Sequence, residues 1–530
     1  MSSPLPEVDA LFAEWDKPDA PGCALGIVRD SALVYARGYG MANLDYGIPI
    51  TPASVFHVAS LSKQFTAMCI LALAAGGKLT LDDDIRRYLP EIPDYGQTIT
   101  IRHLILHTSG LRDQWELLRL AGWREDDLIT NGDVLAVASR QRELNFAPGA
   151  QWLYSNTGYT LMALIVERLS GQSLRAFADA TIFQPLMMAH THFHDDHTMI
   201  VPSRAYGYQP RDTGGLRISI PVFDTVGATS LFTTVEDLAR WARNWEERRV
   251  GSDLLDQMVV PGVLNSGERL TYGIGLMIEP YRSLLTIGHG GADAGYRAHF
   301  LRFPEQGCAI IILGNLSTLA PGLLARRVAD VVLAEHFTQE PERASSATDA
   351  YLPSAANLSR AVGLYRHAPT GKIYRVSCEG GKLTVDDRPP AHLVPVAPGR
   401  FKTVDTPLDM TLTIAEDGTR ALRERVSGGE VMAFASVDAA APTAEQLASY
   451  PGVYHSDELD VAYTIAMRDD DLVLRRRKVP DSPLRPTIID QFINQERLQI
   501  AFERDEDGQV SGFTIFTGRI RNLRFARQPE

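Results

Sequence analysis

The sequence predicts a mixed α/β (α+β) domain with helices packed on an antiparallel sheet, followed by two small antiparallel β-barrel domains. Helical and strand signals are mixed over residues 1–337, and a stretch rich in Ala, Ser, Pro and charge follows at 338–358. Short alternating strands dominate afterwards. The length of 530 residues, at about 150 residues per domain, agrees with three domains joined by one linker.

The elements of the first domain follow from apolar runs and helix stops. Residues 24–28 and 32–35 are apolar runs on either side of a polar turn, which is typical of a hairpin. Residues 61–75 form a helical stretch that ends at Gly76-Gly77. Residues 310–313 are a short apolar run typical of a buried strand. Further amphipathic helices are expected at about 158–170 and 234–245.

The C-terminal region contains an internal repeat. Gly363-Leu364-Tyr365, Tyr374 and Leu383 recur 89 residues later as Gly452-Val453-Tyr454, Tyr463 and Leu472. The constant offset predicts two copies of one β unit, which we assign to residues 359–440 and 441–530. Short strands separated by turn signals predict a small barrel for each copy.

Charge and composition exclude several classes of partner. With 52 basic and 65 acidic residues the net charge is −13, which repels phosphate backbones, so we expect no nucleic-acid partner. The four cysteines show no disulfide or metal-knuckle spacing. No apolar run is long enough to cross a membrane, and the N-terminus has no basic start before an apolar core. We therefore expect a cytoplasmic protein without membrane association, and a homodimer stays open.

The strongest local signal for chemistry is Ala59-Ser60-Leu61-Ser62-Lys63. Lys occurs seven times in the chain, and this is the one Ser-x-x-Lys among them. At the start of a helix the Ser60 hydroxyl meets the positive end of the helix dipole, and Lys63 lies on the same face. A partly desolvated Lys can be the base that a serine nucleophile needs. The alternative is that Ser60 caps the helix and Lys63 is solvated.

Tyr154-Ser155-Asn156 is the one Tyr-x-Asn in the chain and is expected in a loop before a helix. A Tyr hydroxyl beside a Lys amine can relay protons, and an Asn amide can hydrogen-bond a substrate carbonyl. Taken alone, a packed Tyr and an N-capping Asn are the simpler interpretation.

Gly288-His289-Gly290-Gly291-Ala292 holds the one His-x-Gly of the chain. Its glycines allow a substrate backbone to approach closely. A backbone N–H there can point at a developing oxyanion, paired with the N–H of Ser60. Taken alone, a Gly-rich turn with an incidental His is the simpler interpretation.

Together, Ser-x-x-Lys, Tyr-x-Asn and His-x-Gly in this order resemble the penicillin-recognising serine hydrolases, which include β-lactamases and D,D-peptidases. Segments 106–111, 154–159, 182–186 and 227–231 resemble the class C β-lactamase branch. The resemblance covers about residues 8–335. It implies a β-lactamase/transpeptidase-like catalytic domain, with a helical subdomain beside an antiparallel sheet.

The same resemblance assigns roles to the motif residues. It implies that Ser60 is the acyl-enzyme nucleophile, Lys63 its base and Tyr154 the proton relay. Asn156, His289 and Gly291 would line the substrate cleft. The N–H groups of Ser60 and Ala292 would form the oxyanion hole, and the mechanism would need no metal or other cofactor.

One difference from the usual motif of the superfamily narrows the assignment of this chain within it. Most members have Lys-Thr-Gly or Lys-Ser-Gly where this chain has His289-Gly290-Gly291, which removes a cation that would hold a β-lactam carboxylate. The His-x-Gly motif, the two β domains and segment 454–460 together resemble the bacterial D-aminopeptidases. This implies release of N-terminal D-residues, typically D-Ala, from small peptides or amides. It also implies a loop of the last β domain in the cleft, here 475–486, with Asp481 as the carboxylate for the substrate ammonium.

Other functions stay open. A carboxylesterase or peptide-processing acyltransferase could use the same scaffold, and a binding or sensor protein could use the β domains without turnover. The intact Ser60, Lys63 and Tyr154 favour an enzyme. A cluster of side chains could hold an adventitious metal ion, although a solvated loop is the simpler interpretation: His190, His192, His194, His197, Asp195 and Asp196.

Overall fold

The computed structural model describes residues 5–338, 353–386, 390–403, 409–425 and 431–529, and it confirms the predicted fold class. The chain forms two compact units. The first comprises Met1–Leu111, Arg124–Ser139 and Phe146–Glu340; the second comprises Arg112–Trp123, Arg140–Asn145 and Pro341–Glu530. Two short segments of the N-terminal half therefore fold with the C-terminal barrels. Among the described residues, no helix has the length and apolar content needed to cross a membrane.

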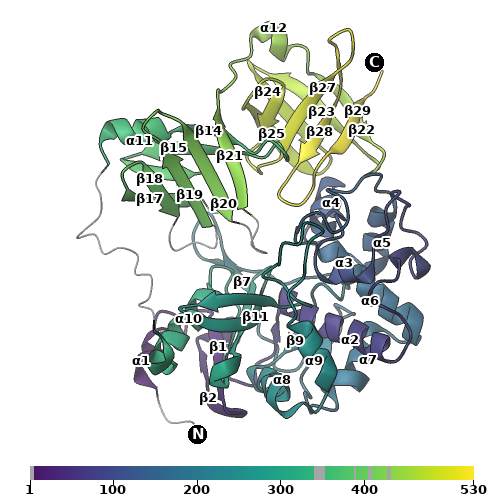
Figure 1. Cartoon of the computed structure of the whole chain (residues 1–530), viewed down its shortest axis with the longest axis vertical. Helices are drawn as coiled ribbons and strands as arrows, with labels where there is room; N and C mark the ends of the chain where they lie inside the picture. Colours follow the sequence, from purple (N-terminus) through teal and green to yellow (C-terminus); the bar gives the residue numbers. More distant parts are fainter. Residues whose placement is uncertain (1–4, 339–352, 387–389, 404–408, 426–430, 530) are drawn as a thin grey trace. The chain divides into compact units, whose positions relative to one another are not determined.

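A six-stranded antiparallel sheet is the frame of the first unit (Figure 1). Its order is β10-β11-β12-β13-β1-β2, with bounds Met277–Tyr281, Leu284–Asp293, Tyr296–Phe303, Cys308–Gly314, Cys23–Arg29 and Ala32–Tyr39. The predicted hairpin is the pair β1 and β2. Asp30 and Ser31 between them have φ values of 47° and 63°, the left-handed pair that a type I′ turn requires.

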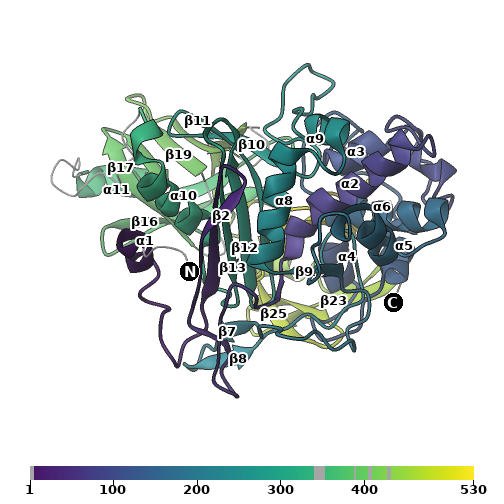
Figure 2. The ribbon, with the colours of Figure 1, turned by 90° about the horizontal axis from the view of Figure 1, so that it is seen from below.

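Helices cover both faces of this sheet, as Figure 2 shows from below. On one face, α10 (Pro321–Val332) and α1 (Pro6–Ala10) enclose a core that contains Leu25 and Val328. On the other face, α8 (Val235–Glu247) packs on β1, where Gly26 faces Val235. Because both faces are covered, β13 is buried along its whole length and shows no alternation of apolar and polar residues.

A layer of helices carries the predicted motifs. Around α6 (Asn156–Ser170) pack α2 (Lys63–Ala75), α3 (Ile101–Ile105), α5 (Asn131–Ser139) and α7 (Leu174–Ala178), while α9 (Ser252–Met258) packs on α2. The helices predicted at 61–75, 158–170 and 234–245 correspond to α2, α6 and α8. Short strands complete the unit: β5 (Phe56–His57), β9 (Leu231–Thr233) and β6 (His192–Phe193) form one sheet, β3 (Met41–Asn43) pairs with β4 (Ile48–Pro49), and β7 (Tyr208–Pro210) pairs with β8 (Leu216–Ile218).

The two copies of the sequence repeat are two closed antiparallel barrels. The first has β14 (Gly363–Arg366), β15 (Ile373–Glu379), β16 (Lys382–Val385), β17 (Ala391–Ala397), β18 (Arg400–Thr403), β19 (Asp409–Ile414), β20 (Arg420–Arg425) and β21 (Val431–Val437). The second has β22 (Gly452–Ser456), β23 (Val461–Arg468), β24 (Asp471–Arg476), β25 (Val479–Pro486), β26 (Gln491–Ile493), β27 (Gln499–Arg504), β28 (Val510–Phe516) and β29 (Leu523–Arg527).

The repeat extends to single hydrogen bonds. A short helix precedes each barrel, α11 (Ala355–Ala361) and α12 (Ala444–Leu447). Tyr365 donates its O–H to the Ala361 carbonyl, and Tyr454 donates to the Tyr450 carbonyl, each at 2.6 Å. In each copy, the equivalent tyrosine of the first strand therefore forms a hydrogen bond with the segment that precedes the barrel. Helix α11 begins within the predicted linker, of which residues 339–352 lie outside the described part of the chain.

Within the second unit, the segment with α4 (Gln114–Leu120) is joined to the second barrel by buried polar contacts. The side chains of Arg112 and Glu458 are 0% and 5% exposed, and Arg112 Nη1 lies 2.5 Å from Glu458 Oε2. Tyr463 also donates its O–H to the Leu120 carbonyl at 2.6 Å. Glu458 belongs to segment 454–460, which the sequence singled out, so the structure gives this segment a role in packing.

Candidate active site

A tight helical turn brings Ser60 and Lys63 together. Residues Ala59–Ser62 form a 3₁₀ helix, in which side chains three residues apart eclipse, and α2 begins at Lys63. Lys63 Nζ lies 3.1 Å from Ser60 Oγ. Ala59 has a φ of 48°, a left-handed conformation that costs a non-glycine residue about 1–3 kcal/mol. Backbone strain of this kind is typical of functional sites.

Lys63 is fully buried and connects three segments of the first unit. Its Nζ donates to Asn156 Oδ1 at 2.9 Å and to the Ala228 carbonyl at 2.7 Å. The same nitrogen lies 4.7 Å from the centroid of the Tyr154 ring. The structure thus gathers Ser60, Asn156 and Tyr154 around one amine.

Tyr154 lies in the loop before α6, as the sequence predicts. The segment 107–108 holds this loop, because Leu153 N donates to the His107 carbonyl at 3.0 Å and Ser155 N donates to His107 Nδ1 at 3.2 Å. The His107 and Tyr154 rings are 4.3 Å apart between centroids. His107 also has a left-handed φ of 58°, so two of the residues with this backbone conformation, Ala59 and His107, lie at the predicted site.

A chain of hydrogen bonds connects His107 to His289 through Tyr272. The Tyr272 hydroxyl lies 3.2 Å from His107 Nε2 and 3.1 Å from His289 Nε2. His289 Nδ1 lies 2.6 Å from the Gly290 carbonyl, which can only accept, so Nδ1 carries the proton and Nε2 accepts from Tyr272. Because Ser155 N donates to His107 Nδ1, His107 Nε2 carries the proton and donates to the Tyr272 oxygen. The contacts therefore define one neutral tautomer for each histidine.

His289 stays uncharged in this position. Burial, and next the Lys63 ammonium, lower the pKa of His289 to about 3. Burial also raises the pKa of Tyr272 well above its usual value. The His-x-Gly motif therefore places an uncharged imidazole, with both ring nitrogens bonded inside the protein, where the resemblance implies a Lys cation in most members.

The glycine at position 291 is required by close packing. A Cβ atom on Gly291 would lie 2.1 Å from the Val58 carbonyl oxygen and 3.3 Å from Ala59 Cβ. Strand β11 therefore runs directly against the backbone that precedes Ser60. Ala292 follows Gly291 on this strand, so its N–H lies in the segment that the resemblance assigns to the oxyanion hole.

Asp481 lies in the second unit, on β25 of the second barrel. Residues 475–486 form a hairpin there, since Arg476 pairs with Val479 across a two-residue turn. The Asp481 carboxylate accepts from Arg468 and, at 3.2 Å, from Arg475. Two guanidinium groups thus compensate its charge, and its role toward a substrate ammonium stays a prediction.

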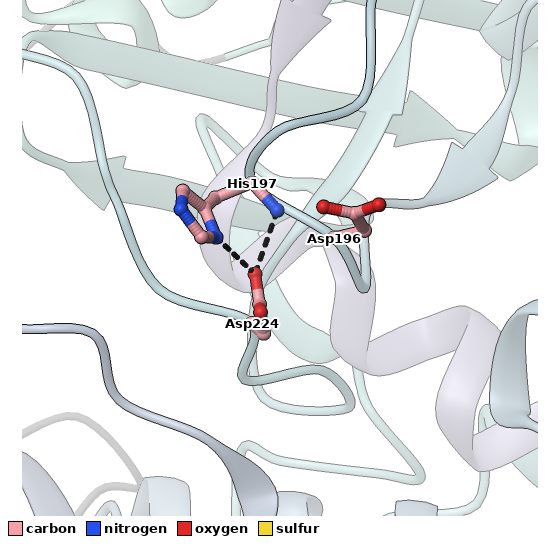
Figure 3. Close-up of side chains that lie close together, drawn as sticks. All are labelled: Asp196, His197 and Asp224. Carbon is pink, nitrogen blue, oxygen red and sulfur yellow. Dashed lines mark hydrogen bonds and ion pairs between the residues drawn. The ribbon is translucent and has the colours of Figure 1, made fainter.

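The histidines and aspartates of residues 190–197, for which a solvated loop was the simpler interpretation, divide into buried and exposed members. His192 and His194 pack on Phe232, and burial lowers the pKa of each to about 4. Asp196, His197 and Asp224 place one ligand atom each within 4.8 Å of one another (Figure 3). His197 lies 3.0 Å from Asp224 through Nδ1, so the cluster forms hydrogen bonds within itself. We assign it no ligand.

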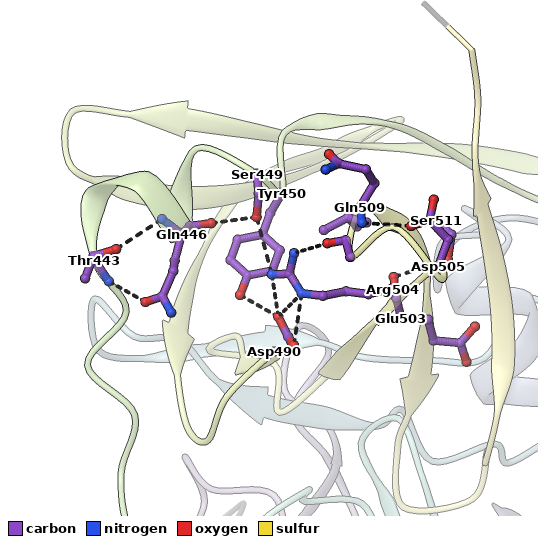
Figure 4. A network of polar contacts seen from close by, with 12 residues as sticks. Thr443, Gln446, Ser449, Tyr450, Asp490, Glu503, Arg504, Asp505, Gln509 and Ser511 are labelled. Carbon is purple, nitrogen blue, oxygen red and sulfur yellow. Dashed lines mark hydrogen bonds and ion pairs between the residues drawn. The ribbon is translucent and has the colours of Figure 1, made fainter.

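The second barrel has a cavity of about 550 Å³ beside α12. Tyr450 donates its O–H to Asp490 Oδ1 at 2.8 Å, and Arg504 Nη2 donates to the same oxygen at 2.8 Å (Figure 4). The polar groups at this cavity therefore bond to one another, and the predicted site residues do not line it.

The structure adds residues that the sequence did not identify. Tyr272, which joins His107 to His289, is in no motif and gave no sequence signal. Asp293 and His57 lie next to the motifs, one residue after Ala292 and three residues before Ser60. Position next to a motif was the one signal that could have identified these two.

The fold and the site geometry define a serine hydrolase with the β-lactamase fold. The family described as Beta-lactamase matches residues 8–334, and the chain belongs to this family. Residues 437–528 match a domain of unknown function, DUF3471, which includes the second barrel. The predicted superfamily and enzyme class are confirmed.

Relatives extend this similarity beyond the catalytic domain. A D-aminopeptidase from Gluconobacter oxydans (strain 621H) is 26% identical over 444 residues, 83% of this chain and 81% of the relative. The octameric penicillin-binding protein homologue from Pyrococcus abyssi has a TM-score of 0.58 at 23% identity, covering 81% of this chain and 99% of that chain. The D-amino acid amidase from Ochrobactrum anthropi SV3 has a TM-score of 0.52 at 21% identity, covering 62% and 99%.

Proposed function

We propose that the chain is a D-stereospecific aminopeptidase or amidase that releases N-terminal D-residues from short peptides or amides through an acyl-enzyme on Ser60. The observation that carries the proposal is the buried Lys63 amine, 3.1 Å from Ser60 Oγ and held by two further acceptors. The similarity to a D-aminopeptidase over 83% of the chain supports the substrate class. A cytoplasmic location and a homodimer stay predictions.

The contacts of Lys63 suit a general base. Asn156 Oδ1 and the Ala228 carbonyl can only accept hydrogen bonds. In its deprotonated form, Lys63 donates both of its N–H groups to these oxygens and turns its lone pair toward the Ser60 hydroxyl, whereas its protonated form is the ammonium that lowers the pKa of His289. Ser60 Oγ then forms a bond to the substrate carbonyl carbon, and its proton passes to Lys63. The N–H groups of Ser60 and Ala292 hold the resulting oxyanion.

Collapse of this intermediate breaks the C–N bond and leaves an ester on Ser60. The departing amine or ammonia takes the proton from Lys63, with the Tyr154 hydroxyl as the relay. A water molecule then attacks the ester, gives its proton to the same groups, and releases the D-amino acid as Ser60 regains its O–H. The sum of the two steps is hydrolysis of the amide bond by one water molecule.

The neutral His289 supports a substrate without a carboxylate at this position. A fixed cation would attract the carboxylate of a β-lactam or of a D-Ala-D-Ala terminus. Burial keeps His289 uncharged, and both of its ring nitrogens are already bonded to Gly290 and Tyr272, so it cannot form an ion pair with a substrate carboxylate. Amides and short peptides that place an uncharged group there therefore fit better.

The test compares D-Ala p-nitroanilide with L-Ala p-nitroanilide. We expect a clear preference for the D form in the wild type and a loss of more than about 10³-fold in Ser60→Ala. Ser252→Ala, an exposed serine at the start of α9, is the matched control and should retain wild-type rates. If neither anilide is cleaved while a fluorophosphonate still labels Ser60, the aminopeptidase is discarded and a serine hydrolase remains. Faster turnover of short-chain nitrophenyl esters would favour the carboxylesterase.

A further inference from the structure

Asp293 is a partly exposed carboxylate at the end of the strand that carries the predicted oxyanion hole. It is the last residue of β11 and directly follows Ala292, so their Cα atoms are about 3.8 Å apart. Alternate residues of a strand share one face, so Asp293 lies on the same face as Gly291 and His289. Gly291 packs against the Val58 carbonyl on that face. Asp293 therefore lies on the side of β11 that faces the segment of Ser60.

The contacts of Asp293 connect it to the other parts of the site. Its Oδ2 atom lies 3.2 Å from His57 Nε2, and His57 precedes Ser60 by three residues. The same oxygen accepts from the Thr229 hydroxyl at 3.3 Å, and Thr229 follows Ala228, whose carbonyl binds Lys63. The carboxylate thus touches the segments that carry the nucleophile and the anchor of the base.

The second carboxylate oxygen is available to a ligand. Both hydrogen bonds end on Oδ2, and Oδ1 accepts none from the described residues. The side chain is 27% exposed, whereas that of His57 is 1% exposed. His57 contacts this carboxylate, and Arg297 interacts with it electrostatically. Arg297 donates its Nη1 to the carbonyls of Ala294 and Tyr296. Asp481, in contrast, is paired with two arginines.

We infer that Asp293 binds the ammonium group of the substrate beside the oxyanion hole. This inference rests on the proposed aminopeptidase function. When the substrate carbonyl occupies the oxyanion hole, its α-ammonium is only two bonds from the carbonyl carbon, so the group that binds the ammonium must lie beside the hole. Asp293 directly follows Ala292, and its Oδ1 atom accepts no hydrogen bond from the described residues, so it can accept one from this ammonium; such a charge-assisted hydrogen bond is about twice as strong as a neutral one.

The experiment measures kcat/KM for D-Ala p-nitroanilide and for its N-acetyl form, in which the ammonium is replaced by a neutral amide. We expect Asp293→Asn to lower kcat/KM for the free amine by about 10- to 100-fold, mainly through KM, with little effect on the acetylated form. Partial unfolding would lower both rates equally, so the ratio of the two reports ammonium binding alone. Asp212→Asn, the same change at an exposed residue, should leave the ratio unchanged.

Other outcomes overturn the inference. Equal losses on both substrates would reduce Asp293 to a structural link between His57 and Thr229. If Asp481→Asn lowers the ratio of kcat/KM for the free amine to kcat/KM for the acetylated form, while Asp293→Asn leaves this ratio unchanged, the ammonium would be assigned to Asp481. If the wild type cleaves neither anilide, the proposed function fails, and protection of Ser60 from a fluorophosphonate by D-alanine amide then tests the inference by itself. Protection in wild type but not in Asp293→Asn would support it; equal protection would overturn it.

Discussion

The buried pair of Arg112 and Glu458 allows a quantitative prediction for Glu458→Gln. The pair lies within the second unit, with side chains 0% and 5% exposed. Arg112 also donates to Gln141 Oε1 at 2.9 Å and to the Arg521 carbonyl at 3.1 Å. Glu458 Oε2 accepts from Arg142 N at 2.7 Å. A glutamine has the same shape and can still accept from Arg142 N, so the variant removes mainly the charge.

The expected loss in the free energy of unfolding follows from the guanidinium of Arg112, which remains buried in the variant. Removing one partner of a buried ion pair typically destabilises a protein by about 3–5 kcal/mol, because the other charge stays buried without compensation. Since Arg112 keeps its contacts with Gln141 and with a backbone carbonyl, we expect about 3 kcal/mol for the second unit. Adding Arg112→Met removes the buried charge, so the double variant should be more stable than the sum of the two single effects predicts.

Urea unfolding, followed by tryptophan fluorescence, measures this free energy. Trp115 and Trp123 belong to the second unit and the other four tryptophans to the first, so the effect of Glu458→Gln is measured on the transition that this substitution shifts. The control is Asp457→Asn, the adjacent residue, whose ion pair with Arg142 is exposed at 59% and 68% and should contribute about 0–1 kcal/mol. If Glu458→Gln and Asp457→Asn shift the free energy of unfolding equally, or if the double variant is simply additive, the reasoning is refuted.

Two further predictions concern buried hydrogen bonds and protons. Tyr272→Phe leaves the His107 N–H and the His289 Nε2 atom without the hydroxyl that they share. We therefore expect kcat/KM for D-Ala p-nitroanilide to fall about tenfold. An unchanged kcat/KM would show that this chain of hydrogen bonds has no catalytic role. Burial holds the pKa of His194 at about 4, below the unfolded value near 6.5, so its neutral form stabilises the fold fully above pH 6.5 and progressively less as the pH falls toward 4. His194→Phe should therefore recover about 1 kcal/mol at pH 5 but nothing at pH 7, and equal shifts in urea unfolding at both pH values would contradict this.

Much of the fold was predictable because its signals are local. The hairpin of β1 and β2, the buried strand β13 and the helices α2, α6 and α8 each follow from a pattern within a few residues. The barrel repeat followed from a constant spacing, and the paired tyrosines Tyr365 and Tyr454 show that the spacing reflects one structural unit. The segments with Arg112 and Arg142 were not assigned to the second unit, because no local pattern shows which distant surface will cover a polar segment.

By itself, the sequence determined the pairing of Ser60 with Lys63, because the geometry of this pair is set within one helical turn. Ser60 and Lys63 meet because a 3₁₀ turn brings residues i and i+3 into register, and resemblance added Tyr154, Asn156 and His289 as separate motifs. Only the tertiary structure decided that Asn156 and Ala228 hold the Lys63 amine, that Tyr272 joins two histidines, and that Asp293 lies against His57. These residues are far apart in the chain, so their contacts form only when the segments that carry them pack together in the folded domain.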